Sequence, residues 1–239
     1  CDWSSDVCSS DLTLNSTLPK TTPYNRLSFM SGEPGVQKKI SFNSVVSANN
    51  LNFKDIIISG NAVSLSDSSL GDMGNNANIT FSSAKTVYYI YPGAGDIMSL
   101  SAGYALSSGG STSLTNFPLP QDSVIIDNNS NITSSNIATI GSPFFIKNLD
   151  VSGATTPYIV VSSMLGLTGN LICNSSTVWN PNNYTLYPTF LYNTIHFLGS
   201  NPQYIDSGNV PIPYPLYFYP SNTVTLLNNL RSEEHTSEL

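Results

Sequence analysis

Charged residues are scarce in this chain: Asp, Glu, Lys and Arg make up only 10% of its 239 residues. The sequence has no basic patch that would attract nucleic acid and no acidic run that would form a solvating tail. Its apolar runs are far shorter than the roughly twenty residues of a membrane-spanning helix. Good helix formers do not recur at helical spacing. The sequence therefore predicts no nucleic-acid partner, no membrane partner and no helical fold.

The two ends of the chain, residues 1–12 and 231–239, are interpreted as translated sequencing adapter. Back-translation of the C-terminal peptide RSEEHTSEL gives a DNA sequence whose reverse complement, in another frame, lies inside a legal back-translation of residues 3–12. One inverted DNA repeat therefore encodes both ends. Such segments are set aside when the fold is considered, as a tag would be. We expect residues 13–230 to be an internal, metagenomic fragment of a longer protein.

Setting the ends aside changes both the charge and the cysteine count. Six of the fifteen acidic residues and one of the eight basic residues lie there, which leaves nine acidic and seven basic residues and moves the net charge from −7 to −2. Cys173 is then the only cysteine, so an internal disulfide framework and a cysteine-based zinc site are excluded. We expect Cys173 to be a small core residue rather than a nucleophile.

The sequence is rich in short β-type segments bounded by Asn, Gly and Pro. Strands are predicted at residues 40–46, 51–59, 62–65, 78–81 and 86–91. Residues 92–121 contain many turn formers and little periodicity, which indicates a long irregular excursion. The predicted organisation is a β-rich end of a preceding unit at 13–85, the excursion at 86–122, and a regular β region at 123–230. The fold class is therefore all-β.

Four triplets with apolar first and third residues lie in the regular region at nearly constant spacing. They begin at Leu149, Leu171, Ile195 and Leu216, at intervals of 22, 24 and 21 residues. A period in the low twenties with one short strand per turn is typical of a parallel β-solenoid, or β-helix. We therefore predict that these four residues stack in one buried column. The middle residues of the triplets, Asp150, Ile172, His196 and Tyr217, are then predicted to point outward.

Asn148 and Asn170 precede the first two triplets, and they are predicted to form a short Asn ladder between coils. A two-sheet β-sandwich has strands of similar length and stays open as the alternative fold.

Several segments resemble one group of proteins. They are SLGDMGNNANITFSSAKTVYYI at 69–90, SSGGSTSLTNFPLPQDSVIIDNNS at 107–130, NLDVSGATTP at 148–157 and LYFYPSNTVTLLNNL at 216–230. As a set they resemble repetitive, tail-fibre-like β-solenoid proteins of phages and viromes, mostly of undefined function. The chain departs from that group at Tyr88, Tyr89 and residues 96–104, where Trp residues are expected. The resemblance implies a virion or extracellular surface location and a structural or receptor-binding role.

Few residues are candidates for chemistry, and we predict no catalytic, cofactor-binding or metal-binding residue. Asp150 and Asp206 would be the pair to test as glycosidase carboxylates. Asp122 and Asp127 are expected to accept hydrogen bonds from turn backbone. With no second His or Cys beside it, His196 is expected to be an ordinary outward strand residue.

Other motifs are weak. No aspartate-rich calcium loop is present, and Gly93–Gly95 and Gly109–Gly110 are not followed by the GK[ST] of a phosphate loop. The sequons at Asn15, Asn78, Asn128, Asn131, Asn174 and Asn183 are attributed mostly to composition. Six tyrosines are expected to fill a solenoid flank rather than form a sugar-stacking strip; they are Tyr184, Tyr187, Tyr192, Tyr214, Tyr217 and Tyr219.

The sequence therefore favours a non-enzymatic structural or receptor-binding segment of a phage virion appendage. Its expected partners are a cell-surface glycan or receptor and further copies of itself, as a homo-oligomer such as a trimer. The alternatives are a carbohydrate-active β-helix, which two or more carboxylates on one outward face would favour, and a cellular surface adhesin. If the solenoid is interrupted at Leu230, its last strands have unpaired edges and the chain should self-associate.

Overall fold

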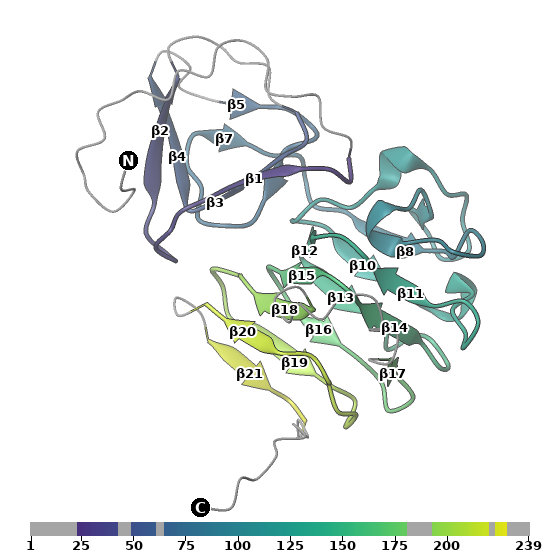
Figure 1. Cartoon of the computed structure of the whole chain (residues 1–239). Coiled ribbons are helices and arrows are strands. Elements are labelled where there is room, and N and C mark those ends of the chain that lie inside the picture. The colour runs from purple at the N-terminus through teal and green to yellow at the C-terminus, as the bar shows by residue number, and fades with distance from the viewer. Residues whose placement is uncertain (1–22, 43–48, 61–64, 181–192, 220–222, 229–239) are drawn as a thin grey trace, which may run out of the picture.

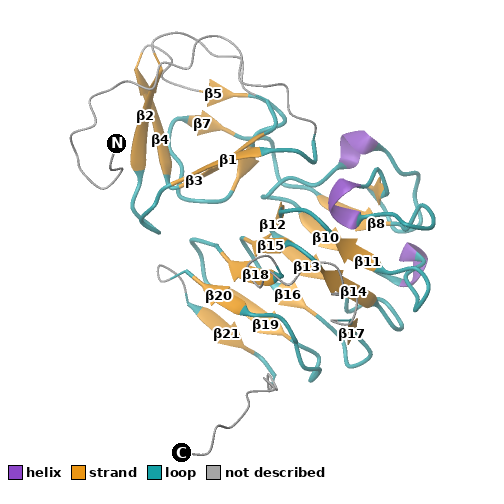
Figure 2. Ribbon diagram, in the orientation of Figure 1, coloured by secondary structure: helices purple, strands orange, loops and turns teal. Residues whose placement is uncertain are grey.

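The computed structural model describes residues 23–42, 49–60, 65–180, 193–219 and 223–228. Within these ranges the chain is all-β and contains no α-helix, only three short 3-10 turns. The strands stack in parallel from coil to coil, with β8 and β9 as the single antiparallel pair among the described strands. The chain is a parallel β-solenoid, as predicted, and it has two units (Figures 1 and 2).

The N-terminal unit is built from three small parallel sheets. The first pairs β1 (Leu27–Met30), β3 (Leu51–Lys54) and β6 (Gly71–Asp72); the second pairs β2 (Lys38–Phe42) and β4 (Ile56–Gly60); the third pairs β5 (Leu65–Ser66) and β7 (Ile79–Thr80). Its core is a separate apolar cluster that includes Phe53, Ile58 and Leu70. The Phe29 and Phe53 rings stack at 5.6 Å, one coil above the other.

The main unit is a solenoid whose coils run through three sheets in turn. The largest sheet contains β8 (Thr86–Tyr89), β9 (Tyr104–Ala105), β10 (Ser123–Ile125), β13 (Asn148–Asp150), β16 (Leu171–Ile172), β19 (Gln203–Asp206) and β21 (Val224–Leu226). The second contains β11 (Ala138–Ile140), β14 (Tyr158–Val161) and β17 (Val178–Trp179). The third contains β12 (Phe144–Ile146), β15 (Met164–Leu167), β18 (Thr194–Phe197) and β20 (Leu216–Phe218). From β10 to β18, three successive strands therefore complete one coil.

The predicted single column of Leu149, Leu171, Ile195 and Leu216 is wrong. Leu149 pairs with Leu171 in the seven-stranded sheet, whereas Ile195 pairs with Leu216 in the four-stranded sheet. The column through Leu149 runs Val87, Val124, Leu149, Leu171, Ile205 and Leu226. All three faces of a coil carry the same apolar-x-apolar pattern, so the spacing alone does not say which triplets share a face.

Asn148 and Asn170 do connect successive coils. The Asn148 Oδ1 atom accepts a hydrogen bond from the Asn170 backbone N–H at 2.6 Å, and Asn148 Nδ2 donates to Ser123 Oγ at 2.8 Å. Asn170 Oδ1 in turn accepts from the Tyr204 N–H at 2.9 Å. The predicted ladder is therefore a series of hydrogen bonds in which each Asn side chain accepts from a backbone N–H of the next coil.

The irregular excursion follows β8 and covers one end of the main core. It contains η1 (Met98–Leu100), β9 and η2 (Leu114–Asn116), and it returns to the solenoid at β10, next to β8. Tyr89, Tyr104 and Phe117 are buried there, with ring centroids 5.5 Å apart in each successive pair. The Tyr104 hydroxyl donates to the Met98 carbonyl at 2.6 Å. This segment is therefore a packed aromatic cap, although its sequence has no strand or helix period.

The two units touch where the sheet of β1, β3 and β6 faces the end of the excursion. Gln121 links them, because its Oε1 accepts from Asp72 N at 2.9 Å and its Nε2 donates to the Leu70 carbonyl at 3.2 Å. A Cβ at Gly71 would collide with Asn52 Oδ1 of the same unit and would come within 2.5 Å of Pro120 Cδ of the main unit. The close packing on both sides therefore requires glycine at this position.

Candidate functional site

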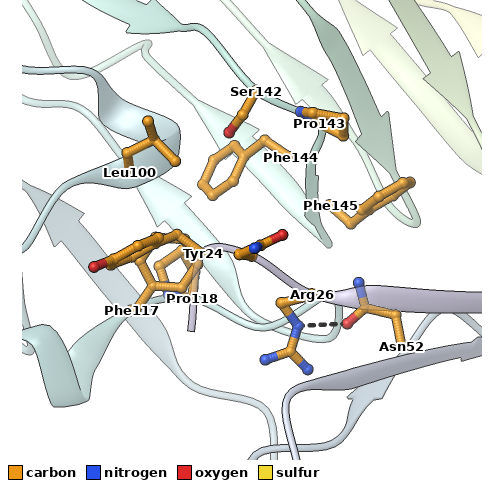
Figure 3. A pocket seen from close by; sticks show the side chains of 11 residues that line it. Tyr24, Arg26, Asn52, Leu100, Phe117, Pro118, Ser142, Pro143, Phe144 and Phe145 are labelled. Atoms are coloured by element: carbon orange, nitrogen blue, oxygen red, sulfur yellow. Dashed lines mark hydrogen bonds between the residues drawn. The ribbon is translucent and has the colours of Figure 1, made fainter. Parts of the chain in front are cut away.

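A cleft of about 350 Å³ lies between the N-terminal unit and the main solenoid (Figure 3). The N-terminal unit lines it with Tyr24, Asn25, Arg26 and Asn52. The main solenoid lines it with Leu100, Phe117, Pro118, Ser142, Pro143, Phe144 and Phe145. The cleft thus lies where three segments meet: the excursion, the turn before β12 and the segment before β1.

Aromatic rings make up much of the cleft wall. The Tyr24 and Phe117 rings meet edge to face at 6.1 Å, and Phe117 and Phe144 do so at 5.9 Å. Phe117 and Phe144 are buried, whereas Tyr24 and Phe145 are only partly covered. Phe145 alternates with the buried Phe144 and Ile146 of β12, so its ring points out of the core. The partly covered rings of Tyr24 and Phe145 offer apolar surface to a ligand.

Of the described residues that line the cleft, only Arg26 is charged. Its Nε donates to Asn52 Oδ1 at 2.6 Å, and its Nη2 donates to the Leu51 carbonyl at 3.0 Å and the Ser69 carbonyl at 2.6 Å. Nη1 makes one long contact of 3.4 Å, to Asn50 Oδ1. Burial lowers the Arg26 pKa to about 10, partly offset by the charge of Asp122. The guanidinium is still protonated at neutral pH, and it joins three coils of the N-terminal unit.

Asp122 and Asp127 both serve turns, as predicted. Asp122 is buried; its Oδ2 accepts from Leu119 N at 2.8 Å and from Lys85 Nζ at 2.7 Å. Asp127 caps η3 (Asn128–Ser130) by accepting from Asn129 N at 2.9 Å. Neither carboxylate lines the cleft.

Asp150 and Asp206 lie in one outward column of the seven-stranded sheet, with Ile172 of the intervening coil between them. Both side chains are partly exposed, as the prediction for Asp150 required. Asp150 Oδ1 accepts from Ser152 N at 2.9 Å, and Asp206 Oδ1 accepts from Gly208 N at 3.0 Å. Each carboxylate therefore already holds a turn at the end of its strand.

Cys173 and His196 have the structural roles expected of them. Cys173 is buried and free, and its burial raises the thiol pKa to about 12, with smaller contributions from Asp206 and Asp150. His196 lies on the outer face of β18, where its ring stacks on Tyr217 at 4.7 Å and its Nε2 lies 2.8 Å from Thr194 Oγ1. Burial lowers the His196 pKa.

The described tyrosines of the predicted flank divide between two environments. Tyr214 is buried against Trp179 at 5.8 Å, whereas Tyr217 and Tyr219 lie beside His196. Tyr184, Tyr187 and Tyr192 lie outside the described residues, as do the sequons at Asn15 and Asn183. Among the other sequons, Asn78, Asn128 and Asn131 are exposed and Asn174 is partly buried.

In the described ranges, no group of three or more His, Cys, Asp or Glu residues is arranged to hold a metal ion. No helix in the same ranges is long and apolar enough to cross a membrane.

Sequence reasoning did not find the cleft. Its residues come from segments about 120 positions apart, and Tyr24 and Arg26 precede the first predicted strand at 40–46. The only signal in the sequence was an excess of aromatic and proline residues at 117–118 and 143–145.

Comparison with known proteins gives no match: no protein-family description, no curated protein and no solved structure is significantly similar to this chain.

Proposed function

We propose that this chain is a non-enzymatic segment of an extracellular, phage-type appendage that binds a cell-surface glycan in the cleft between its two units. The observation that carries the proposal is an aromatic-walled cleft held on a stiff parallel β-solenoid. The sequence resemblance to tail-fibre-like proteins supports the same role. In this role the solenoid is a spacer and the cleft is the recognition site.

The solenoid suits a spacer because each coil contacts only its neighbours and extends the structure along one axis. Val124, Leu149 and Leu171 are fully buried in successive coils. Burying each such side chain contributes about 1.5–3 kcal/mol relative to leaving it exposed. The stack is therefore stabilised from coil to coil by apolar burial.

The cleft suits a sugar because it combines ring faces with polar groups. Its volume of about 350 Å³ is near the lower end of the roughly 300–1,000 Å³ typical of ligand pockets. Tyr24 and Phe145 present partly exposed rings, and Asn25 presents an exposed amide beside them. A sugar ring has apolar C–H faces that pack on aromatic rings and hydroxyls that bond to amides, so one or two sugar units fit this chemistry.

The proposal is tested by screening the chain against an array of bacterial surface polysaccharides and their oligosaccharides, followed by calorimetric titration of the strongest binder. Tyr24→Ala and Phe145→Ala should each weaken binding roughly tenfold, because an aromatic contact contributes about 0.5–1.5 kcal/mol beyond its buried area. Tyr204→Ala removes a partly buried ring from β19, away from the cleft, and should leave binding unchanged. Binding that is insensitive to both cleft variants, or absent across the array, would contradict the proposal.

The outward column of Asp150 and Asp206 favours a second candidate, a carbohydrate-active solenoid. Two coil spacings put their backbones about 10 Å apart, close to the roughly 6.5–9.5 Å separation of the carboxyl groups in inverting glycosidases. Asp150→Asn and Asp206→Asn keep a side-chain oxygen for each turn but remove the titratable group. Release of reducing ends from the array's polysaccharides that either variant abolishes would establish this candidate. No release by the unmodified chain would eliminate it.

A further inference from the structure

Most polar side chains that line the cleft are already engaged in hydrogen bonds. Asn52 Nδ2 donates to Ser28 Oγ at 3.2 Å, and Ser142 Oγ bonds to Ser99 Oγ at 3.0 Å. The N–H groups of Arg26 donate to oxygens of its own unit, those of Asn50, Leu51, Asn52 and Ser69. These side chains therefore hold the walls of the cleft together and are committed to other protein groups.

Asn25 differs from these residues. It is exposed at the cleft, and within the described parts of the chain its side chain makes no hydrogen bond. The Tyr24 hydroxyl makes none there either, but Figure 3 shows it on the far side of its ring from Phe145 and Asn52. The Asn25 amide is therefore a polar group of the cleft that is open to a ligand.

The residues on either side of Asn25 fix its backbone. Tyr24 packs edge to face on the buried Phe117 ring at 6.1 Å. Arg26 joins three coils of the N-terminal unit through its hydrogen bonds. A group that its neighbours already hold in place loses less freedom when a ligand binds. The backbone that carries the Asn25 amide is thus preorganised.

The chemistry of the open group and its surroundings indicates the ligand. A carboxamide offers N–H donors and a carbonyl acceptor side by side. An acetamido group, the N-acetyl substituent of an amino sugar, offers the same pair, so the two amides can form one bond in each direction. The acetamido methyl group needs an apolar neighbour, and the exposed side chains of Leu100 and Pro143 line the same cleft. No described carboxylate lines it and the Arg26 donors are committed, which favours an uncharged sugar.

We infer that the sugar recognised by the cleft is an N-acetylated hexosamine, and that Asn25 is the residue that binds its acetamido group. This inference rests on the proposed function. The sugar ring packs on Tyr24 and Phe145, and the acetamido methyl group packs against Leu100 and Pro143. A plain hexose packs on the same rings but brings no methyl group to the apolar wall.

The first test uses the unmodified chain. The trisaccharides of N-acetylglucosamine and of glucose with the same β linkage differ only at one carbon of each ring, which carries an acetamido group or a hydroxyl. The methyl glycosides of N-acetylgalactosamine and galactose form a second such pair. In calorimetric titration at least one acetamido sugar should bind roughly tenfold or more tightly than its partner, because it gains a hydrogen bond and an apolar contact. Equal affinity within both pairs would overturn the inference.

The second test replaces Asn25. Asn25→Ala should abolish the preference for the acetamido sugar and leave the affinity for the hydroxyl sugar unchanged. Asn25→Asp keeps the shape and the acceptor but loses the donor, so it should retain only part of the preference. Asn201→Ala is the matched control, because Asn201 is also exposed but does not line the cleft. A preference that persists in Asn25→Ala would overturn the role of Asn25.

Thermal unfolding separates a binding role from a structural one. Asn25 is exposed and its side chain makes no hydrogen bond in the described parts of the chain. Asn25→Ala should therefore unfold at the same temperature as the unmodified chain. A fall in the unfolding temperature that accompanies the loss of preference would show a structural role for Asn25 and count against the inference.

The two proposals fail in different ways. Glycans from the array that bind through Tyr24 and Phe145, with no acetamido preference in either pair, would overturn the N-acetylated ligand and leave the glycan-binding role intact. No binding of any glycan, acetylated or plain, would overturn both.

Discussion

Replacing Gln203 with alanine should lower the free energy of unfolding by about 2–4 kcal/mol. Gln203 is buried in β19, and its Oε1 accepts from Gly199 N at 2.9 Å. Its Nε2 donates to the carbonyls of Leu167, at 3.1 Å, and Gly169 in the preceding coil. The Leu167 carbonyl keeps a second donor, Leu198 N, so alanine orphans two buried backbone groups, at Gly199 and Gly169. Each costs about 1–3 kcal/mol, and water entering the space recovers part of that.

The measurement is thermal and urea unfolding followed by far-ultraviolet circular dichroism. For a chain of this size the melting temperature should fall by roughly 5–15 °C, since 1 kcal/mol corresponds to about 2–4 °C. Gln37→Ala is the matched control, because Gln37 makes one exposed bond, to the Asn75 carbonyl at 3.1 Å, and its loss should change stability by less than about 0.5 kcal/mol. Equal effects of the two substitutions would refute the claim that Gln203 ties adjacent coils together.

Three further predictions test other parts of the structure. Gly71→Ala should destabilise the chain by about 1–3 kcal/mol in urea unfolding, because the added Cβ meets Asn52 Oδ1 and Pro120, whereas Gly32→Ala, with open space around it, should not; equal effects would contradict the close packing around Gly71. Phe218 and Leu226 continue core columns into the last described coil, yet they are 49% and 51% exposed. Sedimentation velocity should therefore show self-association that Phe218→Ser with Leu226→Ser reduces, and a monomer at high concentration would contradict this. The Cys173 thiol, with its pKa raised to about 12 by burial, should react with a disulfide reagent at pH 8 only after unfolding; fast reaction in the folded chain would show that it is accessible.

The fold class could be predicted from the sequence because a solenoid is repetitive. The interval between Leu149 and Leu171 is one full coil, and these two residues pair as expected. The interval between Leu171 and Ile195 is almost the same length but crosses from one sheet to another. Leu171 instead pairs with Ile205, 34 residues later. A periodic pattern thus revealed the coils, but strand pairing was needed to assign the faces.

The cleft could not be predicted because nothing local marks it. Tyr24 and Phe117 are far apart in sequence, and they meet only because the N-terminal unit packs against the excursion through Gly71 and Gln121. The roles of Asp122 and Asp127 were predictable because turn aspartates accept from nearby backbone N–H groups.

The most direct test of the glycan-binding role is backbone amide chemical-shift mapping of the chain during titration with the strongest binder from the polysaccharide array. The proposal predicts that the largest shifts occur around the cleft, at Tyr24, Arg26, Phe117 and Phe145. Shifts centred on Asp150 and Asp206 would instead place sugar on the outer face of the seven-stranded sheet and contradict the cleft as the binding site.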